Sequence, residues 1–227
     1  MEELEVSVIL PCRNEETTVG ICIDEALECL SQHGIRGEIL VVDNASDDSS
    51  AQIAREHGAK VIEEAAKGYG NALRAGIEAA CGRILLIADS DTTYDMGELF
   101  SLYDKIKNEG FDMVIGDRFE GGIESGAMSL SHVFGGRMLS AIARLRFHND
   151  INDFHCGLRG ITKEAAEKLA LNTEGMEFAT EMIAKASKRG MRIGQVPVSL
   201  KNSRFPRESK LRTIRDGFRH LFFIIRG

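Results

Sequence analysis

The chain of 227 residues has no tryptophan, only three prolines, and 23 glycines that follow no fixed period. These features exclude collagen-like chains, proline-rich ligands and repeat arrays. Its five cysteines are odd in number and form no C-x-x-C pair, which argues against a disulfide framework or a zinc site. No signal peptide precedes the first apolar run, and no apolar stretch reaches the roughly 20 residues that cross a bilayer. We therefore expect a cytoplasmic protein.

The composition is that of a globular protein, with 43% hydrophobic and 28% charged residues, but the charge is unevenly distributed. The net charge is −7. Residues 201–227 contain eight basic and two acidic side chains, a net +6, which leaves −13 on the first 200 residues. An acidic body with a basic tail predicts that the tail meets an anionic partner, such as phospholipid head groups, a phosphate ligand or nucleic acid.

Apolar runs with strand character alternate with segments of helical period in the first half of the chain. The strands are expected at residues 6–10, 38–42, 59–62, 83–88 and 112–115, and the helices at 17–31, 46–56, 70–80 and 96–108. After Phe119 we expect a glycine-rich loop to Ser131, a helix at 132–146, a loop that carries Asp153, a helix around 177–188 and a last strand at 192–196. This rhythm predicts an α/β fold with a mostly parallel central sheet and helices on both faces.

Polar and acidic residues follow the predicted strands, at the edge where ligands of such sheets bind. Asp89 and Asp91 come directly after a buried strand, where both carboxylates can turn toward one divalent cation. An isolated pair of this kind more often forms a turn or caps a helix. Its place after the central strand, with Asp43 at the matching place on the second strand, favours a metal site.

Asp43 can accept hydrogen bonds from a nucleotide base or ribose, although an Asx turn explains it equally well. No G-x-G-x-x-G follows the first strand, and no G-x-x-x-x-G-K-[ST] occurs anywhere. These absences disfavour a dinucleotide-binding dehydrogenase and a P-loop NTPase.

Several cationic residues in the second half could neutralise phosphate oxygens, although each alone is more often a solvated surface charge. They are Arg118, Arg137, Arg159, Arg204 and Lys210. His155 and Cys156 are adjacent but lack the spacing of a zinc site and the context of an activated nucleophile, so we expect structural roles for both.

Residues 209–226 have the pattern of a basic amphipathic helix. Packing on the domain and contact with a membrane surface explain this pattern equally well. Because the chain grows more apolar toward Gly227, we expect a membrane segment to follow in a longer parent protein.

Taken together, the motifs resemble an inverting family 2 glycosyltransferase with a GT-A fold, most closely the polyprenyl-phosphate (dolichol-phosphate) hexose synthases. The resemblance covers nearly the whole chain. Its motifs are Val8-Ile-Leu-Pro-Cys-Arg-Asn-Glu15, Val41-Val-Asp-Asn-Ala-Ser-Asp47, Lys67-Gly-Tyr-Gly-Asn-Ala72, Ala88-Asp-Ser-Asp-Thr-Thr-Tyr94, Val114-Ile-Gly-Asp-Arg-Phe119, Asp153-Phe-His-Cys-Gly-Leu-Arg159 and Gly175-Met-Glu-Phe-Ala-Thr-Glu181. Thr93 stands where many such synthases have Gln, and Arg207 stands where their pattern has Gly.

The resemblance implies three groups of site residues. The donor nucleotide sugar would be bound by Pro11, Asn14, Glu15, Asp43, Lys67 and Asp89, the metal by Asp89 and Asp91, and the acceptor phosphate by Arg118, Arg137, Arg204, Ser209 and Lys210. Asp91 and Asp153 would be the catalytic acids, with Asp153 orienting the acceptor or taking a proton. Residues 1–200 would form the GT-A domain, and 201–227 a basic acceptor loop with a juxtamembrane helix.

The implied reaction is transfer of a hexose from a nucleotide sugar to a polyprenyl phosphate, with Mg²⁺ or Mn²⁺, at the cytoplasmic face of a membrane and without a nucleic-acid partner. Since a phosphate monoester is already anionic, its attack needs positioning more than deprotonation. Two alternatives remain: a soluble family 2 transferase that acts on a saccharide, and a non-catalytic module that docks on membranes and binds nucleotides. A sugar nucleotidyltransferase is disfavoured, because the residues after the first strand are not glycine-rich.

Overall fold

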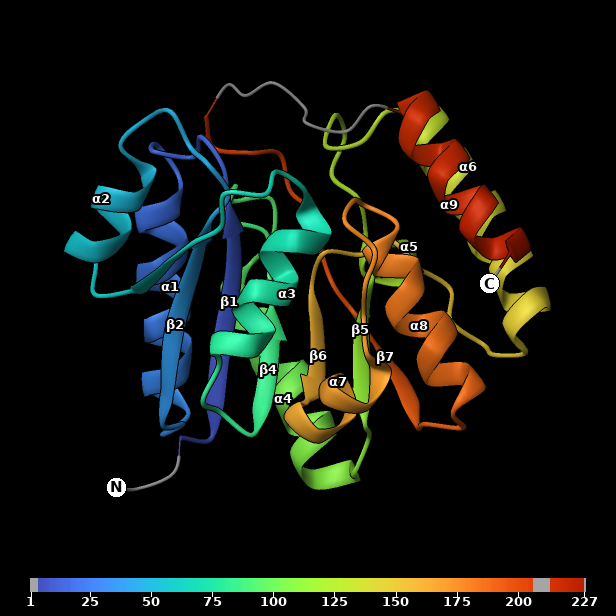
Figure 1. The fold of residues 1–227 in the computed structure, drawn as a ribbon, viewed down its shortest axis with the longest axis horizontal. Helices are drawn as coiled ribbons and strands as arrows, with labels where there is room; N and C mark the ends of the chain where they lie inside the picture. The colour runs from blue at the N-terminus through green and yellow to red at the C-terminus, as the bar shows by residue number, and fades with distance from the viewer. Residues whose placement is uncertain (1–3, 206–212, 227) are drawn as a thin grey trace.

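A computed structural model of the chain describes residues 4–205 and 213–226 (Figure 1). The strands are β1 (Val6–Cys12), β2 (Gly37–Asp43), β3 (Lys60–Glu63), β4 (Ile84–Ile87), β5 (Met113–Asp117), β6 (Arg159–Thr162) and β7 (Ile193–Pro197). The helices are α1 (Val19–Gln32), α2 (Ser50–Glu56), α3 (Tyr69–Ala79), the 3-10 turn η1 (Met96–Glu98), α4 (Leu99–Glu109), α5 (Arg118–Gly121), α6 (Leu130–Phe147), α7 (Lys163–Leu169), α8 (Phe178–Lys188) and α9 (Thr213–Arg226).

The seven strands form one sheet in the order β3-β2-β1-β4-β6-β5-β7. All neighbouring strands are parallel except that β6 runs antiparallel to both β4 and β5. Consequently β1, β2, β4 and β5 end at the same edge of the sheet, and β6 begins there. This edge collects the polar residues that follow the predicted strands.

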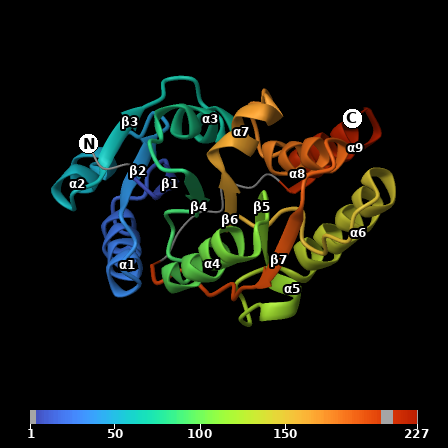
Figure 2. The ribbon, with the colours of Figure 1, turned by 90° about the horizontal axis from the view of Figure 1, so that it is seen from below.

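Helices cover both faces of the sheet, as predicted. Figure 2 shows α3, α7 and α8 on one face and α1 and α4 on the other. The strands between these layers are apolar on both sides: Ile9, Leu10, Leu40, Leu85 and Leu86 are fully buried. In the sequence, strands enclosed in this way are continuous apolar runs rather than alternating ones. For this reason β1, β2 and β4 can be predicted from the sequence.

The structure corrects the predicted pattern between Asp153 and the helix near Glu177. This stretch, predicted as a loop, contains β6 and α7. The predicted helix at 209–226 corresponds to α9, which begins at Thr213, and its first four predicted residues lie outside the described part of the chain.

Arg159, the first residue of β6, is fully buried. Its guanidinium donates hydrogen bonds to the carbonyl oxygens of Cys156 (2.7 Å), Ala179 (2.8 Å) and Phe154 (2.7 Å). Burial lowers the pKa of this side chain. Arg159 therefore fixes the segment before β6 against α8. Its guanidinium binds backbone carbonyl oxygens and not, as predicted, a phosphate ligand.

The helices α6 and α9 lie side by side at the end of the molecule opposite to α2 (Figures 1 and 2). Within residues 4–205 and 213–226, no helix has the length and apolarity that a membrane span needs.

We expect Arg159→Met to lower the free energy of unfolding by at least about 3 kcal/mol, because it leaves three buried carbonyl groups without a donor. Urea unfolding followed by circular dichroism measures this change. The control is Arg189→Met, since Arg189 is exposed at the end of α8 and its replacement should stay within about 0.5 kcal/mol of wild type. An Arg159→Met protein as stable as the control would contradict the anchoring role.

Candidate active site

Asp43 ends β2 and pairs with Cys12 at the end of β1. Its side chain is buried, and Oδ2 accepts a hydrogen bond from the Ser46 amide (3.4 Å). Oδ1 is also buried and has no hydrogen-bond partner among the described residues. A buried carboxylate oxygen without a donor is costly, so this position suits an N–H or O–H group brought by a ligand.

The loops after β1 and β2 are tied together beside Asp43. Asn14 has a left-handed backbone, with φ of 52°, and accepts from the Asp47 amide through Oδ1 (2.8 Å), while its own amide donates to Ser46 Oγ (3.0 Å). The amide of the buried Glu15 donates to Ser50 Oγ (2.8 Å). Asn14 and Glu15 thus shape the wall that carries Asp43.

Two further predicted donor-binding residues border this wall. The carbonyl of Pro11 accepts from Ser90 Oγ (2.8 Å), which joins the end of β1 to the loop after β4. Lys67 is exposed in the loop between β3 and α3. That loop is fixed by Asn44, whose side chain accepts from the Gly68 amide (2.7 Å) and donates to the carbonyl of Ala66 (2.9 Å). The structure therefore places Lys67 next to the loop that follows Asp43.

Asp89 and Asp91 lie in a tight loop after β4. Thr92, directly after Asp91, has a left-handed backbone with φ of 61°. Asp91 is buried, and its Oδ1 accepts from both the amide (3.0 Å) and the hydroxyl (2.5 Å) of Thr93. Thr93, the residue that departs from the family pattern, therefore holds the Asp91 carboxylate in place.

The loop before β6 touches Asp89. A Cβ atom added to Gly157 would stand 2.3 Å from Asp89 Oδ2, so only glycine allows this approach. The Gly157 amide donates to the hydroxyl of Tyr94 (3.0 Å), and the Tyr69 hydroxyl lies 3.5 Å from Asp89 Oδ1. Burial raises the pKa of both tyrosines well above the usual range, so both stay protonated as donors. Neither tyrosine is predicted from the sequence as a site residue, although both lie in motifs that carry the family resemblance.

Asp153 and Arg118 form a buried ion pair at the end of β5, in the half of the edge where the acceptor is predicted to bind. Arg118 Nε lies 2.6 Å from Asp153 Oδ2, and Nη2 lies 2.9 Å from Oδ1. Burial alone would raise the pKa of the Asp153 carboxyl, but the charge and hydrogen bonds of Arg118 outweigh it and lower that pKa. Since a guanidinium carries five N–H donors, Arg118 keeps further donors for a ligand.

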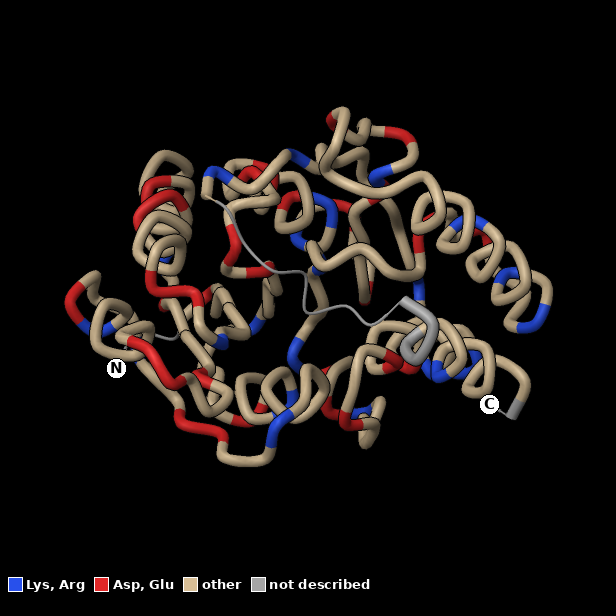
Figure 3. Tube along the Cα trace, turned by 90° about the horizontal axis from the view of Figure 1, so that it is seen from above, with Lys and Arg blue, Asp and Glu red and all other residues tan. Residues whose placement is uncertain are grey.

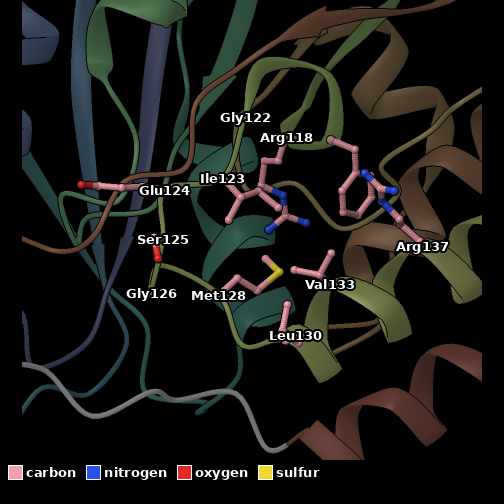
Figure 4. Close-up of a pocket in the computed structure, with 11 residues that line it drawn as sticks. Arg118, Gly122, Ile123, Glu124, Ser125, Gly126, Met128, Leu130, Val133 and Arg137 are labelled. Carbon is pink, nitrogen blue, oxygen red and sulfur yellow. The ribbon is translucent and has the colours of Figure 1, made fainter.

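Arg118 also lines a cavity of about 490 Å³ between α5, the loop at 122–128 and α6 (Figure 4). Arg137 lines it from α6, with its guanidinium 4.8 Å from the centre of the Phe119 ring. Most of the other side chains around it are apolar: Phe119, Ile123, Met128, Leu130 and Val133. The cavity thus joins two guanidinium groups to an apolar wall.

The remaining predicted acceptor residues lie in the C-terminal segment. The Arg204 amide donates to Thr92 Oγ1 (3.2 Å), and its side chain pairs with Glu25 of α1 (2.5 Å). The structure thus brings Arg204 to the Asp89–Asp91 loop and not to the cavity of Arg118. Ser209 and Lys210, like Arg207, lie outside the described residues.

His155 and Cys156 lie between the two halves of the site. Neither ring nitrogen of His155 has a hydrogen-bond partner in the described part of the chain, and the ring packs edge-on against His220 of α9, 4.5 Å between centres. Burial and the His220 charge lower the pKa of His155, so its ring is neutral. Burial raises the pKa of Cys156 to about 12, which leaves it an unreactive thiol.

The chain matches the model of glycosyl transferase family 2 over residues 7–170. It belongs to this family. It is 34% identical to the low-salt glycan biosynthesis hexosyltransferase Agl6 of Haloferax volcanii, over 97% of this chain and 53% of that protein. It is 30% identical to the dolichyl-phosphate hexose transferase of the same organism, over 86% of this chain and 82% of the relative. The chain thus spans about half the length of the first of these relatives.

The fold is that of glucosyl-3-phosphoglycerate synthase from Mycobacterium tuberculosis, with a TM-score of 0.79 and 22% identity over 97% of this chain and 80% of that one. That synthase has been solved with phosphoglyceric acid, and also with Mn²⁺ and UDP-glucose. The predicted family and the predicted GT-A fold are both confirmed. The predicted roles of the individual residues stay predictions.

Replacing Asp153 by Asn should lower the free energy of unfolding by about 3–5 kcal/mol at pH 7, because it leaves the Arg118 charge buried without its partner. The ion pair contributes fully above the pKa of an unfolded Asp, about 3.9, and is lost as the pH falls through the lower pKa of folded Asp153. Urea unfolding of wild type and Asp153→Asn between pH 7 and pH 3.5 measures the difference in their free energies of unfolding. This difference should stay constant down to about pH 5 and shrink below pH 4.

The control for this series is Asp104→Asn on the surface of α4, where the side chain only accepts a hydrogen bond from Asn108. If the difference in unfolding free energy between wild type and Asp153→Asn grows toward low pH, the result contradicts the ion pair.

Proposed function

We propose that the chain transfers a hexose from a nucleoside diphosphate sugar to a polyprenyl phosphate, with inversion and with Mg²⁺ or Mn²⁺. The observation that carries this proposal is the cavity in which Arg118, oriented by Asp153, and Arg137 face an apolar wall. Two guanidinium groups suit a phosphate monoester, and the apolar wall suits the start of a hydrocarbon chain. The dolichyl-phosphate hexose transferase among the relatives supports the same acceptor.

The donor would bind at the ends of β1, β2 and β4. The partnerless Oδ1 of Asp43 would accept a hydrogen bond from the nucleoside, inside the wall that Asn14 and Glu15 hold. Lys67, exposed at the same edge, would reach the diphosphate. These residues would fix the sugar in front of the acceptor cavity.

Asp89 and Asp91 would hold the divalent metal. Among the residues described, no group of three or more His, Cys, Asp or Glu gathers to bind a metal by protein ligands alone. Two carboxylates fit a cation that takes its other ligands from a diphosphate and water, as Mg²⁺ usually does. When bound, such a cation neutralises the negative charge of the departing diphosphate.

The reaction would form a bond between the acceptor phosphate oxygen and the anomeric carbon, while the bond from that carbon to the donor diphosphate breaks. The nucleoside diphosphate leaves with the electron pair, and no proton has to move because the attacking oxygen is already anionic. Arg118 and Arg137 would hold the phosphate in line. Since both oxygens of Asp153 lie on Arg118, orienting that guanidinium is the role that the geometry favours for it over taking a proton.

The test is transfer of labelled sugar from UDP-glucose and from GDP-mannose to polyprenyl phosphate in detergent, with Mn²⁺ or with a chelator. We expect lipid-extractable label from one donor, and none with the chelator. Metal-dependent hydrolysis of a donor without labelled lipid would contradict the acceptor and favour a soluble one, such as a saccharide. If no nucleotide sugar is turned over, the result contradicts an enzymatic function and favours a module that only binds.

In the same assay, Asp91→Asn should reduce transfer at least about a hundredfold, because it removes charge at the proposed metal site while keeping the size of the side chain. Its matched control, Asp24→Asn, changes an exposed aspartate on α1 that pairs with His57 and should transfer at the wild-type rate. Unchanged transfer by Asp91→Asn would overturn the metal assignment.

Asp43→Asn should weaken binding of the donor nucleotide about 10- to 100-fold, as expected for a hydrogen bond to a charged group. Titration calorimetry with UDP and with GDP in the presence of Mn²⁺ measures this change and shows which nucleotide binds. Asp24→Asn again serves as the control. Equal affinity of the Asp43→Asn and wild-type proteins would remove Asp43 from the nucleoside site.

A further inference from the structure

The helix α6 exposes a row of large apolar side chains. Leu130 is 87% exposed, Phe134 73%, Met138 50% and Leu145 79%. Their spacing of four, four and seven residues places them on one side of the helix, while Ser140, Ala143 and Phe147 are buried on the other. Single exposed apolar residues are ordinary, but a continuous row marks an interaction surface.

The helix α9 adds a second row beside the first. Phe218 is 67% exposed, Phe222 55% and Ile225 66%, again at helical spacing. The opposite side of α9 holds it to the domain, where Arg219 pairs with Glu177 (2.6 Å) and His220 hydrogen-bonds Thr180 (2.8 Å). Because α6 and α9 pack on each other, the two rows belong to one end of the molecule.

The charge of these two helices is opposite to that of the rest of the chain. By sequence, α6 has three Arg and no acidic residue, and α9 has three Arg and one Asp, which gives net charges of +3 and +2. The remainder of the chain therefore carries −12. Figure 3 shows Lys and Arg positions along both helices. Arg219 of α9 is paired with Glu177, so α6 contributes most of this positive charge. An apolar row on helices of net positive charge, in an otherwise acidic chain, suits an anionic lipid surface.

The cavity of Arg118 lies next to this face. Leu130, the first residue of the exposed row, also lines the cavity, together with Val133 and Arg137 of the same helix (Figure 4). A lipid whose chain lies along the row on α6 would therefore bring its phosphate to Arg137 and Arg118.

We propose that the exposed apolar rows of α6 and α9 together form a docking face for an anionic phospholipid surface, with α6 contributing as much as the C-terminal helix. The inference rests on the proposed function, because it places the acceptor cavity at the lipid surface. A second copy of the chain fits the face less well, since symmetric pairing of these helices would bring two cationic faces together.

The test uses the full chain and vesicles of phosphatidylcholine with 30% phosphatidylglycerol, measured by co-sedimentation. The triple variant Phe134→Ser, Met138→Ser and Leu145→Ser changes only α6 and leaves the cavity lining intact. We expect its partition into vesicles to fall at least about tenfold, as loss of three apolar contacts with the bilayer requires. Partition into vesicles should fall by a similar factor for the triple variant on α9, Phe218→Ser, Phe222→Ser and Ile225→Ser.

The control is Leu27→Ser, because Leu27 is an exposed apolar residue on α1, far from the face. All variants should keep the circular dichroism spectrum of the wild type and its affinity for whichever of UDP and GDP it binds. Wild-type protein that stays in the supernatant, or an α6 variant that sediments like wild type, would overturn the inference. So would a wild-type dimer that the same substitutions convert to a monomer without vesicle binding.

The two proposals fail separately. Vesicle binding that depends on α6, together with no transfer to polyprenyl phosphate, would support the docking face and contradict the acceptor. Transfer to polyprenyl phosphate in detergent by an α6 variant that sediments with vesicles like wild type would support the acceptor and contradict the docking face.

Discussion

The hydrogen bonding of the buried Arg159 guanidinium is the interaction on which the predicted acceptor half of the structure depends. It binds the carbonyl groups of two residues in the loop before β6 and of one residue in α8, and so fixes where an antiparallel strand enters an otherwise parallel sheet. Because β6 runs against its neighbours, the loop before it arrives at the edge where β4 and β5 end. Asp153 can then reach Arg118 at the end of β5, and Gly157 can touch Asp89 after β4. With a parallel strand in this place, the same loop would lie at the opposite edge.

The donor half could be predicted from the sequence because its signals are local. The strands β1, β2 and β4 are apolar runs bounded by polar turns, and the rule that ligands bind beyond the ends of parallel strands then points directly to Asp43, Asp89 and Asp91. The strand β6 carries no such signal. It has four residues, one of them Gly160, and it follows a loop without helical or strand period. It is a strand because β4 and β5 offer hydrogen-bonding edges on both sides, which is a property of the tertiary structure.

The candidate site shows the same division between local and tertiary information. Arg118 and Asp153 were each singled out, one for the acceptor phosphate and the other as a catalytic acid, but the sequence does not reveal that they pair, since 35 positions separate them. Tyr69 and Tyr94 escaped notice because tyrosines near a strand end have many structural uses. Their contacts with Asp89 and with the Gly157 amide become visible only when the loop before β6 is in place. Thr93 differs from these tyrosines, because its contact is local: its hydroxyl donates to Asp91, two residues away.

The arrangement of charge at the sheet edge explains why the proposed reaction would call for two kinds of cation. Asp43, Asp89 and Asp91 make the predicted donor half acidic, so a nucleoside diphosphate bound there would need a divalent cation to screen both partners. In the predicted acceptor half, the positive charge comes from arginine side chains of the protein itself. An unpaired guanidinium at the depth of Arg118 would be costly to bury, and Asp153 offsets this cost while fixing the direction of the remaining donors. Asp153 also cancels much of the charge of Arg118, so a phosphate in the cavity would depend on Arg137 for net attraction and on Arg118 for orientation. Arg137 belongs to α6, the helix that exposes the apolar row, so the proposed attraction of the acceptor and the proposed contact with the lipid surface would reside in the same element.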